Sequence, residues 1–115
     1  DFTYIDDVTE GTVRVLDGLP ILQQEDQLET GAPYRIFNIG NENPVQLMNY
    51  IETLEANLGR SAKKNLLPMQ PGDVPATWAD VTALKKAVNY SPKISINEGV
   101  TEWVKWYLRY TGKDK

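Results

Sequence analysis

The 115-residue sequence contains no cysteine and no histidine. Without cysteine the chain can form neither disulfides nor thiolate metal sites. Without histidine it lacks the commonest general base and the commonest ligand of transition metals. The sequence also has no apolar run long enough to span a bilayer, and no signal-peptide pattern at its start. These absences predict a protein without a metal site or a membrane segment.

The composition is that of a soluble globular domain. Hydrophobic residues make up 41% and charged residues 24% of the chain. The formal net charge is −4, whereas binding to a nucleic-acid backbone needs a concentrated basic face. We therefore expect one domain with its own core and no nucleic-acid partner.

The pattern of apolar and turn-forming residues predicts an α/β fold with short strands and about four helices. Residues 3–5 and 34–39 are rich in β-prone side chains and predict two strands, and residues 64–69 predict a further extended segment. Residues 21–33 are acidic and rich in glutamine, which indicates a surface loop. The order is strand–helix, strand–helix, strand–helix–helix.

Four helix starts are predicted from capping residues. Asp7 with Glu10, Asn43 followed by Pro44, Asp80, and Ser95 with Glu98 each precede apolar residues at helical spacing. The apolar stripe of the first helix comprises Ile5, Val8, Thr12, Val15 or Leu16, and Leu19. Three glycines predict helix ends, at Gly18, Gly59 and Gly112.

Several groups of polar or aromatic residues have two interpretations. Asp6, Asp7 and Glu10 are either capping residues or an acidic cluster, and their spacing favours capping. The turn at residues 38–43 is either a plain connection or a ligand-binding edge. Tyr90 and Lys93 are too close, with a proline between them, to form a Tyr-x-x-x-Lys catalytic pair. The aromatic residues of the last helix favour core packing over a sugar-stacking platform, and they are Trp103, Trp106, Tyr107 and Tyr110.

The turn at residues 70–73 is the strongest candidate site. Gly72 permits a tight turn with close approach of the backbone to a ligand. The Gln70 amide can contact a phosphate or sugar oxygen, and the Asp73 carboxylate can accept from a sugar hydroxyl. A plain Pro-Gly turn is the alternative from spacing alone.

An ordered series of motifs resembles the C-terminal part of nucleotide-sugar epimerases of the extended short-chain dehydrogenase/reductase (SDR) family. Each motif is weak by itself, but their order and spacing match over nearly the whole chain. The sequence of residues 67–74 is most similar to the corresponding motif of UDP-glucuronate 4-epimerases. The matching positions are Asp1 to Asp7, Tyr34 to Gly40, Pro71 to Asp73, Ala79-Asp80, Ser91-Pro92, and Gly99 with Trp103, Trp106 and Tyr107.

The resemblance implies that residues 1–115 are a single substrate-binding portion, inactive alone, of a cytoplasmic NAD-dependent isomerase. It implies a UDP-sugar ligand contacted by Gln70, Gly72, Asp73 and Thr77. Many relatives carry arginine where this chain has Gln70, which cannot supply charge to a diphosphate. No catalytic, cofactor-binding or metal residue is assigned within the chain, since NAD and the catalytic Tyr–Lys pair belong to an N-terminal Rossmann part.

Two other functions remain open at this point. The motifs overlap with those of nucleotide-sugar dehydratases and decarboxylases. The lack of a catalytic pair is also compatible with a free-standing binding module, although a start directly in β-prone residues indicates a fragment. In the epimerase interpretation, residues 1–19 pack against the Rossmann part. Alone, their apolar stripe predicts repacking or a homo-oligomer.

Overall fold

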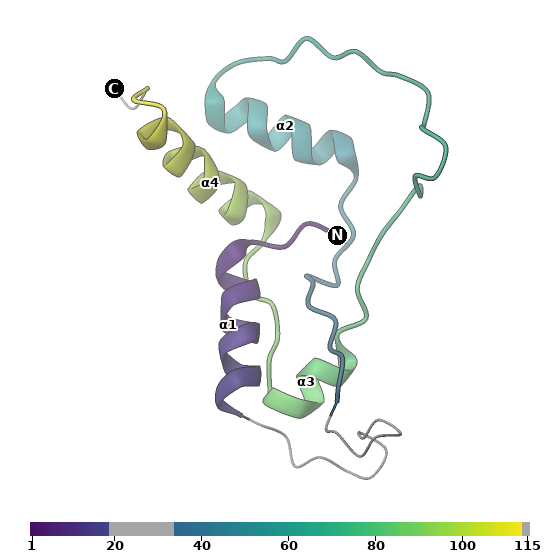
Figure 1. The fold of residues 1–115 in the computed structure, drawn as a ribbon. Helices are drawn as coiled ribbons and strands as arrows, with labels where there is room; N and C mark the ends of the chain where they lie inside the picture. The colour runs from purple at the N-terminus through teal and green to yellow at the C-terminus, as the bar shows by residue number, and fades with distance from the viewer. Residues whose placement is uncertain (19–33, 114–115) are drawn as a thin grey trace.

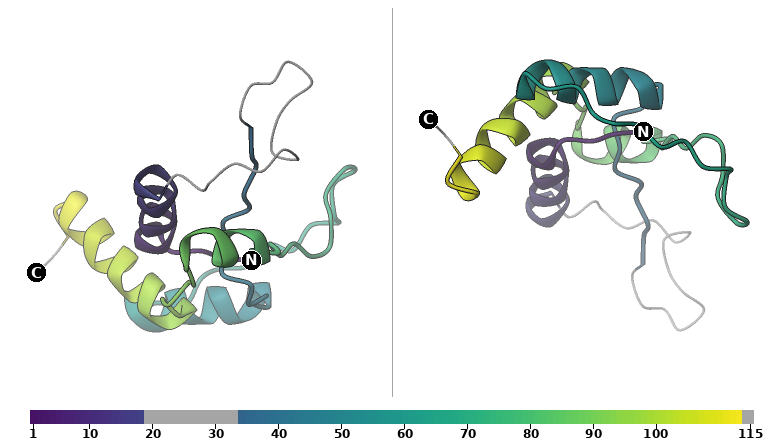
Figure 2. Two further views of the ribbon diagram at one scale, coloured as in Figure 1. Left: turned by 90° about the horizontal axis from the view of Figure 1, so that it is seen from below. Right: turned by 90° about the horizontal axis from the view of Figure 1, so that it is seen from above.

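A computed structural model describes residues 1–18 and 34–113 of the chain. These residues form four helices and no strand: α1 (Ile5–Asp17), α2 (Leu47–Leu58), α3 (Thr82–Val88) and α4 (Ile96–Tyr110). The helices pack in two pairs, α2 on α4 and α1 on α3 (Figure 1). The views from below and above both show α2 beside α4 (Figure 2).

The short strands predicted from the sequence are wrong in the described part of the chain. Residue 5 is already the first residue of α1, and residues 34–40 have neither a helix nor a strand assignment. A β-strand forms only when a neighbouring strand completes its backbone hydrogen bonds. Tyr34 and Ile36 are 50% and 69% exposed. Their high β propensity alone therefore does not produce a strand in the described part of the chain.

Two of the predicted N-caps are also wrong. α1 begins at Ile5 and has Tyr4 as its N-cap residue, three positions before Asp7, the predicted N-cap. α2 begins at Leu47, and neither of these N-termini has a side-chain cap hydrogen bond. The backbone before α2 turns sharply at Glu42, whose φ is 58°. Residues 43–46 then have no helical assignment, which leaves Asn43 and Pro44 outside the helix.

Other helix boundaries follow the sequence signals. The Ser95 hydroxyl accepts from the Glu98 N–H at 3.3 Å, and the Glu98 carboxylate accepts from the Ser95 N–H at 3.0 Å. This capping box at α4 is confirmed. Gly59 ends α2 in the left-handed conformation, with a φ of 62°. Asp80 lies one residue before the N-cap of α3 and accepts from the Thr82 N–H at 2.9 Å.

The buried core of the described part is small. Val81, Leu84 and Tyr90 are at most 1% exposed, and they lie where α1, α3 and residues 37–39 meet. Val100 and Val104 form the buried face of α4. The radius of gyration is 18.4 Å, against roughly 13 Å for a compact domain of this length. The chain is therefore open, with long segments that do not fold back onto the core.

No helix in the described ranges has both the length and the apolar character needed to cross a membrane. The predicted loop at 21–33 and the stripe position Leu19 lie outside the described residues.

Candidate functional site

The four predicted site residues all lie in the α2–α3 segment, defined here as residues 60–78. This segment leaves the end of α2 and runs in a wide arc down to α3 (Figure 1). Every residue from 60 to 78 is exposed. Large apolar side chains share this exposure: Leu66 is 80% and Trp78 is 70% exposed. The segment is thus a surface that the rest of this chain does not cover.

The turn at residues 70–73 has the predicted geometry. The Asp73 N–H donates to the Gln70 carbonyl at 3.2 Å, and Gly72 has a φ of 95°. This φ lies in the left-handed region that favours glycine. A Cβ built at Gly72 has no heavy atom within 4 Å, so the glycine is needed for the backbone conformation and not for packing. Both flanking polar side chains, Gln70 and Asp73, are exposed.

The upstream end of the α2–α3 segment is held by Glu55 of α2. The Glu55 carboxylate accepts from the Ala62 N–H at 2.6 Å and from the Lys64 ammonium at 2.5 Å. The hydrogen bond from Lys64, followed by that from the Ala62 backbone, lowers the pKa of Glu55. Lys64 is the first residue of the predicted extended segment at residues 64–69, which precedes the turn at residues 70–73.

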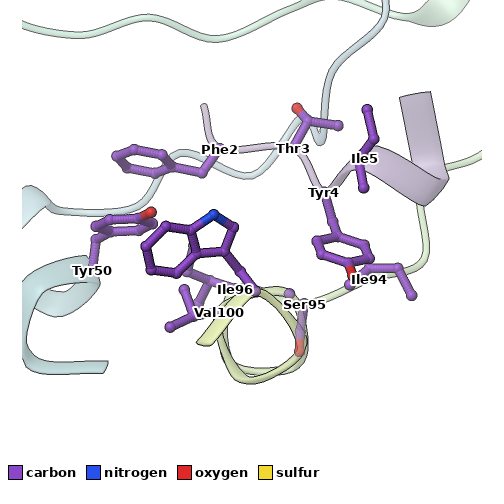
Figure 3. A pocket seen from close by; sticks show the side chains of 11 residues that line it. Phe2, Thr3, Tyr4, Ile5, Tyr50, Ile94, Ser95, Ile96 and Val100 are labelled. Carbon is purple, nitrogen blue, oxygen red and sulfur yellow. The ribbon is translucent and has the colours of Figure 1, made fainter. Parts of the chain in front are cut away.

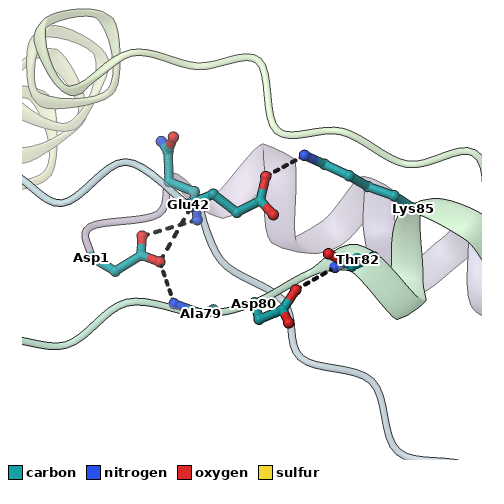
Figure 4. A network of polar contacts seen from close by, with 7 residues as sticks. Asp1, Glu42, Ala79, Asp80, Thr82 and Lys85 are labelled. Carbon is teal, nitrogen blue, oxygen red and sulfur yellow. Dashed lines mark hydrogen bonds and ion pairs between the residues drawn. The ribbon is translucent and has the colours of Figure 1, made fainter.

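The downstream end is held by Asp1 (Figure 4). The Asp1 backbone nitrogen donates to the Thr77 carbonyl at 2.9 Å, and the Asp1 carboxylate accepts from the Ala79 N–H at 2.9 Å. The same carboxylate accepts from the N–H groups of Asn41 at 2.9 Å and Glu42 at 3.3 Å. Asp1 therefore joins the α2–α3 segment to the turn that precedes α2.

A hollow of about 390 Å³ lies at this junction. Among the predicted site residues, Thr77 lines it, together with Asp1 and residues 38–40. The turn at 38–43, which the sequence left open as a plain connection or a ligand-binding edge, is thus brought to Thr77. Gln70, Gly72 and Asp73 are not among the lining residues, so the described chain does not gather the four predicted residues into one cavity.

Charged groups flank the junction. Glu42 forms an ion pair with Lys85 of α3, and Asp80 accepts from Thr82 (Figure 4). Hydrogen bonds from the side chain and backbone of Thr82 lower the pKa of Asp80. The Asn41 side chain donates to the Ile94 carbonyl at 3.0 Å, which connects the turn before α2 to the approach of α4. In the sequence, Asp1 is only the first position of a family motif, and its hydrogen bonds were not predicted. No local sequence pattern indicates which distant N–H groups a carboxylate will accept from.

A second hollow, of about 250 Å³, is mostly apolar (Figure 3). Phe2 and Tyr50 stack on its wall with ring centroids 4.3 Å apart. Trp103 also lines it and is 43% exposed, so the core-packing interpretation is wrong for this residue. Trp103 stacks on Tyr107, and Trp106 stacks on Tyr110, at 5.3 and 5.1 Å. These stacks are along one helix, at the i, i+4 spacing.

The acidic cluster of α1 is divided between different partners. Asp7 is 5% exposed and accepts from the backbone of residues 93–94, whereas Glu10 pairs with Arg14. In the described residues, no group of three or more candidate ligands could hold a metal ion. Tyr90 packs its ring against Gly11, and its buried hydroxyl has no hydrogen-bond partner among the described residues. Burial, and then the neighbouring Asp7 carboxylate, raise the pKa of Tyr90.

Comparison with known proteins places this geometry in a family. No model of a protein family matches the sequence. An uncharacterized protein of Escherichia coli O111:H- is 48% identical over 93% of this chain, which covers 34% of that protein. A probable UDP-glucuronate 4-epimerase of Rhizobium meliloti is 42% identical over 93% of this chain, which covers 33% of that protein.

A solved structure has the same fold over most of this chain. The UDP-glucuronic acid 4-epimerase of Bacillus cereus, in complex with UDP-glucuronic acid and NAD, superimposes with a TM-score of 0.71 and 32% identity. The match covers 93% of this chain and 32% of that protein. The chain therefore spans about a third of the length of the relatives it matches.

The two named epimerases act on a nucleotide sugar according to their names, and the solved one supports an extended SDR fold for this chain. The chain is related over its length to UDP-glucuronate 4-epimerases, and the resemblance seen in the sequence motifs is confirmed.

Proposed function

We propose that this chain is the C-terminal, substrate-binding portion of an NAD-dependent UDP-glucuronate 4-epimerase. The observation that carries the proposal is the 42% identity to a probable UDP-glucuronate 4-epimerase over 93% of this chain. In this proposal residues 1–115 form one portion, and residues 1–19 lie against a dinucleotide-binding part. The broad exposure of residues 60–78 supports it, because an uncovered apolar segment is typical of a surface meant for contact.

The α2–α3 segment supplies the contacts to the UDP-sugar in this proposal. The Asp73 carboxylate accepts from a sugar hydroxyl, and the Gln70 amide donates to a phosphate or sugar oxygen. Gly72 holds the turn that presents them, with its φ of 95°. Thr77 lines the hollow beside Asp1 and offers a hydroxyl there. Because Gln70 is neutral, the segment contributes orientation and sugar selection more than charge neutralisation.

NAD does not fit the residues of this chain. The 115 residues contain no Gly-x-Gly-x-x-Gly run and no Tyr-x-x-x-Lys pair. We therefore assign the cofactor and the proton-transferring groups to no residue between 1 and 115, and the chain alone should be inactive. A cytoplasmic location belongs to the same proposal.

The test uses the full-length protein with NAD and UDP-glucuronate. The expected product is the C4 epimer, which has the same mass as the substrate and is separated by anion-exchange chromatography. Release of CO₂ would identify a decarboxylase, and loss of the mass of one water would identify a dehydratase. Recovery of unchanged UDP-glucuronate would refute the proposed substrate.

Asp73→Asn tests the contribution of the turn at 70–73. Because Asp73 is exposed, the substitution should leave stability unchanged and remove one charge-assisted hydrogen bond to substrate. We expect KM for UDP-glucuronate to rise about tenfold with little change in kcat. Glu52→Gln, at an exposed carboxylate on α2, is the matched control and should retain the wild-type KM. An Asp73→Asn enzyme with wild-type KM would remove Asp73 from the site.

A further inference from the structure

We propose that Asp1 is a positioning residue for the nucleotide-sugar site: it fixes the downstream end of the α2–α3 segment against the turn at residues 40–42. This inference rests on the proposed function, because it assigns the role of Asp1 relative to that site. It differs from a binding role, since the Asp1 carboxylate is already occupied by backbone N–H groups.

The contacts of Asp1 come from two segments that are distant in sequence. One carboxylate oxygen accepts from Asn41, and the other accepts from Glu42 and Ala79. The carboxylate of a single residue therefore joins the Ala79 backbone to the turn at residues 41–42.

The junction leaves little space for any other arrangement. Gly40 is buried, and a Cβ built on it would lie 2.6 Å from the Ala79 Cβ and 2.8 Å from an Asp1 carboxylate oxygen. The turn before α2 and the end of the α2–α3 segment thus approach each other at van der Waals distance. A short side chain with two acceptor oxygens is what reaches N–H groups on both segments at once.

The mechanical consequence concerns the turn at residues 70–73. Glu55 holds the segment at residues 62–64 and Asp1 holds its downstream end at Ala79, while every residue between them is exposed. With both ends fixed, fewer conformations of the turn must be ordered when the ligand binds. Release of the Asp1 end should therefore weaken substrate binding without altering the reacting groups.

Asp1→Asn in the full-length protein is the main variant. It preserves size but replaces one acceptor oxygen with an NH₂ group, which cannot accept from Glu42 and Ala79. We expect KM for UDP-glucuronate to rise about tenfold and kcat to stay within about twofold. Hydrogen exchange of the Ala79 amide should become about tenfold faster, since this N–H loses a charged acceptor. Asp1→Glu keeps the charge and should restore part of the wild-type KM.

Glu52→Gln is again the matched control, with the same replacement of a carboxylate by an amide on an exposed helix position. It should alter neither KM nor exchange at Ala79. Faster exchange at Ala79 with wild-type KM would overturn the inference, because the anchor would then not serve the site. Faster exchange throughout α1 and α3 would also overturn it, because Asp1 would then support the whole fold.

The two proposals fail in different ways. A wild-type protein that leaves UDP-glucuronate unchanged refutes the proposed function, and exchange at Ala79 then decides the anchoring role alone. A wild-type protein that epimerises UDP-glucuronate, together with an Asp1→Asn protein of equal KM and equal exchange, refutes only the inference about Asp1.

Discussion

The carboxylate of Asp7 accepts a hydrogen bond from the Ile94 N–H at 2.9 Å, although the two residues are 87 positions apart. The Lys93 N–H donates to the same carboxylate at 3.1 Å. Asp7 lies in the first turn of α1 and is 5% exposed. This contact fixes α1 to the segment that leads into α4, and it explains why a residue with the sequence pattern of a cap is buried.

Asp7→Ala should therefore destabilise the fold strongly. It leaves two partly buried backbone N–H groups without their acceptor, which we expect to reduce the free energy of unfolding by roughly 2–4 kcal/mol. Urea denaturation measures this difference. Asp6→Ala, at the exposed neighbouring position, should change stability by no more than about 0.5 kcal/mol. Equal effects of the two substitutions would show that the contact with residues 93–94 is unimportant.

The capping box of α4 predicts a pH-dependent contribution to stability. Hydrogen bonds from the Ser95 side chain and then its backbone lower the pKa of Glu98 below the ordinary value of 4.5. A carboxyl with a lowered folded-state pKa stabilises the fold above its unfolded pKa and loses this effect as pH falls through the folded pKa. The stability difference between wild type and Glu98→Gln should thus be constant near neutral pH and shrink below 4.5.

Denaturation curves from neutral to acidic pH measure this difference. Ser95→Ala provides the control, because it removes the first cause of the lowered pKa. In the Ser95→Ala background, the effect of Glu98→Gln should depend less on pH. A difference that is independent of pH in both backgrounds would contradict the role of the Glu98 charge in the cap.

Gly40 and Gly72 predict two different responses to alanine. At Gly40 the new methyl group would overlap Ala79 and the Asp1 carboxylate, which should destabilise the chain by about 1–3 kcal/mol. At Gly72 there is no steric conflict, and only the positive φ disfavours alanine, by roughly 1 kcal/mol. Hydrogen exchange separates them, since only Gly40→Ala should expose the Ala79 amide. The reverse pattern would refute the close packing of Gly40.

The apolar side of α1 predicts association of the isolated 115-residue chain. Ile5 and Leu16 are 62% and 69% exposed, whereas Val15 packs against the core, so part of the predicted stripe is uncovered on this helix. We expect light scattering to give a mass above that of one chain, and we expect Leu16→Lys to reduce it. Asp17→Lys, at an exposed position of the same helix outside the stripe, should leave the mass unchanged. A single-chain mass without binding of an apolar dye would contradict this prediction.

The site was predictable only in part. The turn at residues 70–73 follows from its proline and glycine, and the structure has the expected hydrogen bond and positive φ. The relation of Thr77 to Asp1 was not predictable, because it joins residues 76 positions apart. Trp103 was expected in the core from its helical spacing, yet the face it occupies borders an open hollow. Spacing gives the face of a helix but not what lies against it.

The sequence by itself determined the elements whose signals are local. The Ser95–Glu98 capping box and the left-handed Gly59 delimit helices through contacts within a few residues, and both are present in the structure. Tertiary structure decided whether extended residues become strands, and which N–H groups Asp1 and Asp7 meet. The physical reason is that a strand or a buried carboxylate is completed only by partners distant in the chain, whose place depends on the whole fold.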